Sequence, residues 1–222
     1  MNYLLPLIAV ILGYILALVI QPKKKSNLKL LLAFSGSFLL SVTVISLLPE
    51  VYETKNTTIG LYIMLGILFQ IILEFFSKGA EHGHVHGHQT ITHIPWLLFI
   101  SLCIHALLEG FPVGHHHDLA IGIAIHHLPI AIILTTFFVQ AQLNKKAIFA
   151  FMITFAMMTP LGTLASNYIP GLQEYTTEIT AIVIGILFHI SSTIIFESSE
   201  GNKFNVAKVS MIILGIALAF FI

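Results

Sequence analysis

Residues 95–113 read PWLLFISLCIHALLEGFPV, an apolar run that contains His105 and Glu109. A run of this length can cross the roughly 30 Å hydrocarbon core of a bilayer as one helix. On that helix His105 and Glu109 lie four residues apart and therefore on the same face. Ionisable side chains at this depth are costly unless they are paired, which marks them as functional. The stretch therefore predicts a transmembrane helix that holds an imidazole and a carboxylate, both of them good ligands for divalent transition metals.

The whole chain has the composition of a membrane protein. Of its 222 residues 57% are hydrophobic and 9% are charged, whereas soluble domains carry roughly 25% charged residues. Apolar runs of about 20 residues predict transmembrane helices over 3–21, 28–48, 58–77, 95–113, 119–141, 146–168, 177–197 and 204–222. Because the connections are short, we expect an all-α integral membrane protein in which residues 1–222 form a single polytopic transmembrane domain.

The basic residues predict the orientation in the membrane. The chain has ten lysines and no arginine, and nine of the lysines lie at the first, third, fifth and seventh connections. Cytoplasmic loops carry the excess of basic residues, so we expect both termini on the extracytoplasmic side. The formal net charge of zero argues against a nucleic-acid partner. The single cysteine, Cys103, excludes an intrachain disulfide and a cysteine-based zinc site.

Two connections are rich in histidine. The cytoplasmic loop 78–94 alternates histidine with glycine, a composition typical of metal binding. Its candidate ligands are His82, His84, His86 and His88. The extracytoplasmic connection between the fourth and fifth helices contains His115, His116, His117 and Asp118. The outer cluster could capture metal and the inner one receive it. The alternatives are solvated polar segments, with Asp118 as the N-cap of the fifth helix.

A second pair of histidines, His126 and His127, lies within the run 119–141. The short connection makes the fourth and fifth helices antiparallel neighbours and places His105 and His126 at about the same depth. We therefore expect His105, Glu109 and His126 to converge on one ion near the membrane midplane. A four-coordinate ion needs one more ligand, which could be His127, water or a side chain from another helix.

Prolines accompany these residues. Pro112 and Pro129 each lie three residues after a candidate ligand, and Pro160 lies within the run 146–168. A proline inside a helix leaves the carbonyl four residues earlier without its amide donor. Broken helices with freed carbonyls form ion sites in transporters, so we expect breaks in the fourth and fifth helices; ordinary kinks are the alternative.

This combination resembles the ZIP (Zrt/Irt-like) family of metal transporters over nearly the full length of the chain. The resemblance rests on eight spans, a His-rich third connection and several short motifs. The motifs are Leu47-Leu48-Pro49-Glu50, His105-x-x-x-Glu109-Gly110, His126-x-x-Pro129, Pro160-Leu161-Gly162 and Gly185 in a stretch similar to "AGTFLY". It implies transport of a divalent transition metal, above all uptake of zinc into the cytoplasm, through a primary site of His105, Glu109 and His126. Zinc is then expected as the substrate, with no cofactor.

Three positions depart from the family pattern. Ala106 stands where Asn or Ser is common, Ile130 where Glu or His follows the proline, and Thr159 where some members have a carboxylate. Family members with two metal ions use that missing Glu as a bridging ligand, so His127 is the remaining candidate for a second position. With one carboxylate the site suits Zn²⁺ better than Mg²⁺ or Mn²⁺, and Fe²⁺, Co²⁺, Ni²⁺ and Cd²⁺ are further candidates.

Three further polar residues in the spans have more than one interpretation. His189 could be an additional ligand, an exit-path group or, the interpretation we favour, a buried imidazole that is hydrogen-bonded across helices. Gln70 and Glu74 share a helix face and could line the cytoplasmic exit, although Glu74 could instead extend to the interface.

Two other functions are compatible with a buried metal site. One is an intramembrane zinc hydrolase with Glu109 as general base, and the other is a metal-sensing membrane protein without flux. The chain contains neither the His-Glu-x-x-His nor the Gly-x-Ser-x-Gly motif of hydrolases. Beyond the metal ion, the expected partners are the lipid bilayer and a second copy in a homodimer. The compact loops favour a bacterial cytoplasmic membrane.

Overall fold

The computed structural model of the protein describes residues 3–20, 25–54, 56–77, 93–114, 116–197 and 206–222. All regular secondary structure in these ranges is helical, which confirms the predicted all-α fold. The helices are α1 (Leu4–Ile20), α2 (Lys25–Val42), α3 (Leu48–Glu53), α4 (Ile59–Ser77), α5 (Trp96–Val113), α6 (His117–Gln140), α7 (Lys145–Tyr168), α8 (Thr176–Glu197) and α9 (Val206–Phe220). A π-helical turn, η1 (Thr43–Leu47), joins α2 to α3, and a 3₁₀ turn, η3 (Leu172–Tyr175), precedes α8.

The predicted helices are present at their expected positions. Counting α2, η1 and α3 as one continuous segment, the described residues form eight helical segments. Six of them are long and apolar enough to cross a membrane, judged by length and composition. The other two, α1 and α9, have 17 and 15 residues and are shorter. The orientation of the termini relative to a membrane stays a prediction.

The second helical segment extends further than its predicted end at residue 48. It continues through η1 and α3 to Glu53. Pro49 explains the π-helical turn, because its ring would clash with the carbonyl of Ile45 in an uninterrupted α-helix. The wider turn relieves this clash, and Thr43 Oγ1 donates a hydrogen bond to the Leu39 carbonyl at 2.8 Å beside it.

The predicted breaks in the fourth and fifth helices are wrong. Helix α5 continues through Pro112 to its end at Val113, and α6 continues through Pro129 to Gln140. The close packing of α1 supports α6 at this level, because a Cβ on Gly13 would lie 2.7 Å from the Leu128 carbonyl oxygen. Pro129 therefore removes one backbone hydrogen-bond donor from α6 without interrupting the helix.

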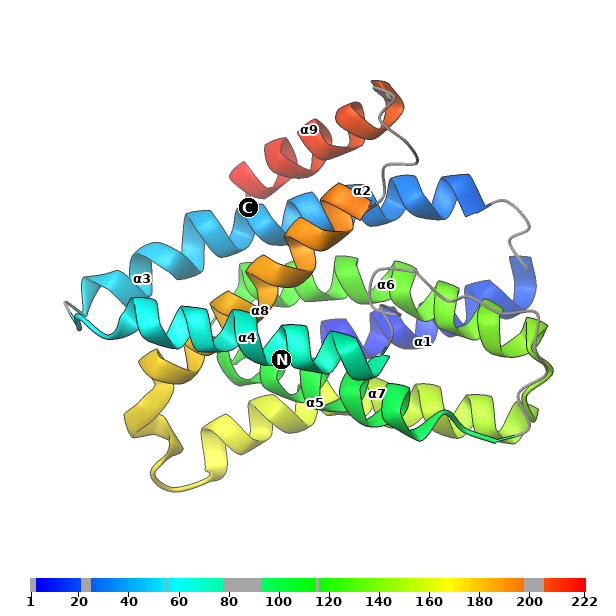
Figure 1. Cartoon of the computed structure of the whole chain (residues 1–222), viewed down its shortest axis with the longest axis horizontal. Helices are drawn as coiled ribbons and strands as arrows, with labels where there is room; N and C mark the ends of the chain where they lie inside the picture. The colour runs from blue at the N-terminus through cyan, green and yellow to red at the C-terminus, as the bar shows by residue number, and fades with distance from the viewer. Residues whose placement is uncertain (1–2, 21–24, 55, 78–92, 115, 198–205) are drawn as a thin grey trace.

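Most helices run roughly along the long axis of the molecule, whereas α8 and α9 are inclined to it (Figure 1). Helix α5 packs on α7 where Gly110 meets Gly162, and α4 packs on α8 where Gly66 meets Gly185. A Cβ added to any of these four glycines would lie 2.0–2.2 Å from a backbone carbonyl oxygen of the partner helix. Small residues allow membrane helices to approach this closely.

The buried apolar side chains form two clusters, and Glu109, His126 and His127 lie between members of the two clusters along α5 and α6. One cluster contains Ala106 of α5 and Ile130 of α6. The other contains Val113 of α5 and Ile123 of α6. The change from one cluster to the other therefore falls between residues 106 and 113 on α5 and between residues 123 and 130 on α6.

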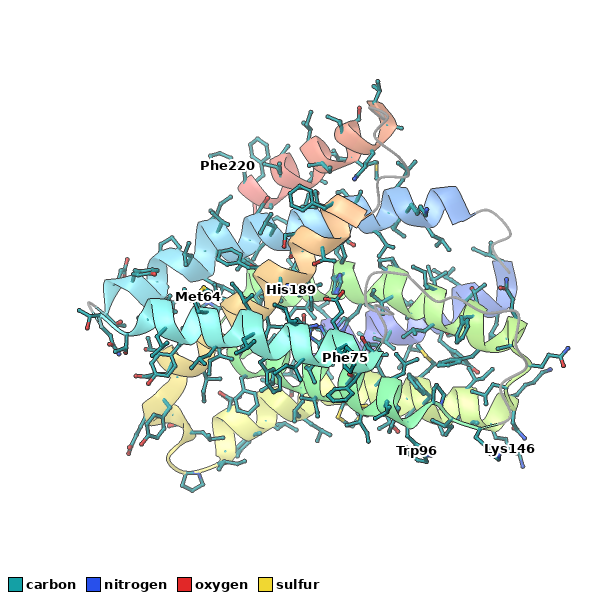
Figure 2. All side chains as sticks on the ribbon, viewed as in Figure 1. Met64, Phe75, Trp96, Lys146, His189 and Phe220 are labelled. Carbon is teal, nitrogen blue, oxygen red and sulfur yellow. The ribbon has the colours of Figure 1, made fainter. Side chains whose placement is uncertain are left out.

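The outer surface of the bundle is apolar. Met64, Phe75, Trp96 and Phe220, which are labelled in Figure 2, are each more than 60% exposed. Lys146, at the start of α7, lies at one end of the molecule in the same view. Large exposed apolar surfaces of this kind are typical of proteins that contact lipid.

Candidate metal centre

Helix α5 supplies the first two candidate ligands. His105 and Glu109 lie one helical turn apart on the same face. His105 Nε2 is 3.1 Å from Glu109 Oε1, and the two side chains are 2% and 0% exposed. Helix α7 holds this turn in place, because Thr163 Oγ1 donates a hydrogen bond to the Gly110 carbonyl at 2.7 Å. The predicted pair is therefore formed and buried.

Helix α6 adds the third side chain, His126, which is 1% exposed. The ligand atoms of His105, Glu109 and His126 lie within 4.8 Å of one another, and we call these residues the central triad. Ligand atoms around a tetrahedral zinc ion, at about 2.0–2.1 Å from the metal, are roughly 3.4 Å apart. An ion could therefore be held after the three side chains approach one another slightly. Among the described residues, no other group of three or more histidine, cysteine, aspartate or glutamate side chains has such geometry.

His127 contacts Glu109 from the other side. Its Nε2 lies 3.0 Å from Glu109 Oε2, and the centre of its ring is 5.3 Å from that of Phe155. The two oxygens of Glu109 therefore face two imidazoles, Oε1 towards His105 and Oε2 towards His127. His127, which the sequence predicted as an additional ligand, is placed where it can orient the carboxylate while Oε1 binds an ion.

Two of the departures from the ZIP pattern are buried near the triad and offer no carboxylate. Ile130 is 2% exposed and belongs to the same apolar cluster as Ala106. Thr159 is buried on α7, and its carbonyl lies against Gly110, the residue after Glu109. Glu109 is the single carboxylate in the central triad.

His189 is not part of the central triad. Its Nε2 lies 2.5 Å from Glu74 Oε2, so it joins α8 to α4. The hydrogen bond across helices in the favoured interpretation of His189 is therefore found, whereas the imidazole is 19% exposed and not fully buried. Glu74, which could have extended to the interface, is instead turned towards α8, and the sequence contained no signal for this pairing.

The outer histidine cluster is only partly described. His116 Nδ1 lies 3.5 Å from Glu50 Oε2, which brings the end of the Leu47–Glu50 motif to the connection between α5 and α6. His117 is the first residue of α6, and Asp118 lies in its first turn. The predicted N-cap role of Asp118 is wrong, because the helix begins one residue earlier than Asp118 and His116 occupies the N-cap position.

The remaining predicted ligands have no structural description. His115 and the loop residues His82, His84, His86 and His88 lie outside the described residues. Their proposed roles in capturing and receiving metal stay predictions.

Comparison with known proteins gives partial similarities to two proteins, one of which is named as a zinc transporter. No protein-family model matches the chain. The chain is 25% identical over 110 residues to a protein of Danio rerio named Zinc transporter ZIP1, a match that covers 39% of this chain and 36% of the relative. It is 27% identical over 127 residues to Protein zntD of Dictyostelium discoideum, covering 49% of this chain and 19% of the relative. The matches thus span well under two thirds of the length of either relative.

Proposed function

We propose that this chain is an integral membrane carrier that moves a divalent transition metal, principally Zn²⁺, into the cytoplasm. The observation that carries the proposal is the burial of His105, Glu109 and His126 on two helices of membrane-spanning length. Imidazole and carboxylate ligands in a membrane interior are costly without a cation to bind. The partial similarity to a protein named as a zinc transporter supports the same conclusion.

Transport requires the triad to replace the hydration shell of the ion. His105 gives up its contact with Glu109 Oε1, and both groups bind the ion together with His126, while His127 keeps Oε2 in place. A dication bound to one carboxylate leaves a net charge of about +1 at the site. This incomplete neutralisation in a low-dielectric interior favours release.

The donor set supports zinc and a single ion. Two imidazoles and one carboxylate suit Zn²⁺ and neighbouring transition metals better than Mg²⁺ or Mn²⁺, which prefer oxygen ligands. The apolar side chain of Ile130 occupies the position from which ZIP proteins with two metal ions provide a bridging carboxylate. We therefore propose one ion per central triad.

The direction rests on the His-rich third connection and on the resemblance to ZIP proteins, and the topology rests on the distribution of basic residues. The excess of lysine at the odd-numbered connections supports a cytoplasmic location for these loops, including the His-rich segment. That segment is then placed to receive metal from the carrier. The absence of large loops in this sequence favours the cytoplasmic membrane of a bacterium.

A hydrolase is less well supported by the same geometry. A general base needs a carboxylate oxygen that can accept a proton from water. In the metal-bound site Glu109 Oε1 would bind the ion and Oε2 would accept the hydrogen bond from His127. Neither oxygen would then remain for the attacking water.

Uptake into liposomes tests the proposal. Purified protein is reconstituted around an impermeant zinc-sensitive dye, and the initial rate is compared between wild type and the His105→Ala/Glu109→Ala variant. The control is Glu53→Ala, because this glutamate is exposed on α3 and lies outside the triad and the His-rich connections. We expect saturable uptake by wild type and the control, and none by the triad variant. Zinc binding by wild type without uptake would refute transport and favour a sensor or a hydrolase.

A further inference from the structure

A second pair of metal-ligand side chains lies where α4 and α8 meet. Glu74 Oε2 and His189 Nε2 are 2.5 Å apart, and the side chains are 23% and 19% exposed. The two residues are 115 positions apart in sequence. In Figure 2, His189 on α8 lies over the middle of the bundle, next to the last turns of α4 where Phe75 is labelled. The pair offers one imidazole and one carboxylate, the same donor types as the central triad.

The pair is close to the central triad and displaced from it in a defined direction. Ser101 lies one helical turn before His105 on α5, and its Oγ donates a hydrogen bond to the Leu73 carbonyl at 2.8 Å. Leu73 is the residue before Glu74. One turn corresponds to about 5.4 Å along the helix. The pair is therefore displaced towards the end of the molecule at which α4 ends and α5 begins, which is the cytoplasmic end in the topology proposed above.

The packing of α4 on α8 fixes the geometry of the pair. Gly66 and Gly185 meet at backbone contact, two turns before Glu74 and one turn before His189. The backbone carbonyl of His189 accepts hydrogen bonds from Ser192 Oγ and Thr193 Oγ1, at 2.9 and 2.8 Å, which stiffens this turn of α8. Both ligand-type side chains are thus held together by the fold, and both remain partly exposed.

We propose that Glu74 and His189 form a second metal-binding station, which takes the divalent ion as it leaves the central triad for the cytoplasm. The inference rests on the proposed transport function and deepens it. The imidazole would exchange its hydrogen bond with the carboxylate for a bond to the ion, and the two atoms would separate from 2.5 Å to roughly 3.4 Å. Two protein ligands completed by water bind more weakly than three, which suits a station from which an ion has to leave.

Isosteric variants separate this role from a structural one. Glu74→Gln keeps the shape of the side chain and a hydrogen bond to His189, but it offers a much poorer metal ligand. Glu74→Gln and His189→Gln are compared with Glu53→Gln, the same change at an exposed glutamate of α3. All are made in a parent protein in which His82, His84, His86 and His88 are serine, so that the loop adds no zinc binding. The measurements are zinc stoichiometry by equilibrium dialysis and the initial rate of liposome uptake.

We expect Glu74→Gln and His189→Gln each to bind one zinc equivalent fewer than the parent and to take up zinc at least about tenfold more slowly. Glu53→Gln should match the parent in both measurements. Unchanged stoichiometry and rate in both variants would overturn the inference and leave a plain hydrogen bond between helices. Loss of the zinc equivalent bound at the central triad as well would also overturn the inference, because the pair would then act by supporting the fold. Loss of one equivalent in a parent that transports no zinc would uphold the second site and refute the transport function.

Discussion

The close contact of α5 with α7 leads to a prediction about helix packing. A Cβ on Gly162 would lie 2.0 Å from the Leu107 carbonyl oxygen, whereas ordinary van der Waals contact begins near 3.4 Å. The neighbour is backbone, which cannot rotate away, so Gly162→Ala has to separate the two helices. Overpacking of this kind typically costs about 1–3 kcal/mol. Because Leu107 lies between His105 and Glu109, the separation also displaces two members of the central triad.

The assay is thermal unfolding in detergent together with zinc uptake. For a chain of this size, about 1–3 kcal/mol corresponds to a fall in Tm of roughly 2–12 °C. Gly60→Ala on α4 is the matched control, since the nearest atom to its added Cβ is Tyr52 Oη at 3.7 Å. We expect Gly162→Ala to unfold at lower temperature than Gly60→Ala and to transport more slowly. Equal Tm values for the two variants would refute the packing described for α5 and α7.

Three further predictions concern the metal site. His127→Leu should weaken zinc binding about 10- to 100-fold without changing the stoichiometry, because Glu109 Oε2 loses its hydrogen-bond partner. Titration calorimetry measures the affinity, and an unchanged Kd would show that His127 does not orient the carboxylate. A fall in pH from 7.5 to 5.5 should weaken zinc binding, because an imidazole binds a metal only without its extra proton and so competes with protons for the ion. A pH-independent affinity would contradict ligation by His105 and His126. Ile130→Glu buries a second carboxylate in an apolar cluster, so in chelator the variant should have a lower Tm than wild type. Added zinc should raise the Tm of the variant more than that of wild type. A variant as stable as wild type in chelator would show that this position is not apolar.

The sequence predicted most of the helical architecture because length and hydropathy determine membrane-spanning helices. The bounds of α4 to α8 lie within two residues of the predicted ranges. The prediction failed at prolines, where local sequence rules and tertiary packing compete. Pro129 lies inside a continuous helix that α1 supports, whereas Pro49, expected near a helix end, is preceded by a π-helical turn.

The central triad was predictable because its residues are close in sequence. His105 and Glu109 are one helical turn apart, and a short connection places His126 opposite them. The pairing of Glu74 with His189 was not predictable, because it depends on the register between α4 and α8. That register is determined by the contact of Gly66 with Gly185, and no pattern within either segment specifies it.

The most direct test of the account is the position of bound zinc. Crystals of the protein grown with zinc would be measured above and below the zinc absorption edge, and an anomalous difference map calculated. We predict a peak within about 2.0–2.2 Å of His105, Glu109 and His126 ligand atoms. Zinc bound only at the loop or surface histidines, with His105 Nε2 still against Glu109 Oε1, would contradict a transport site at the central triad.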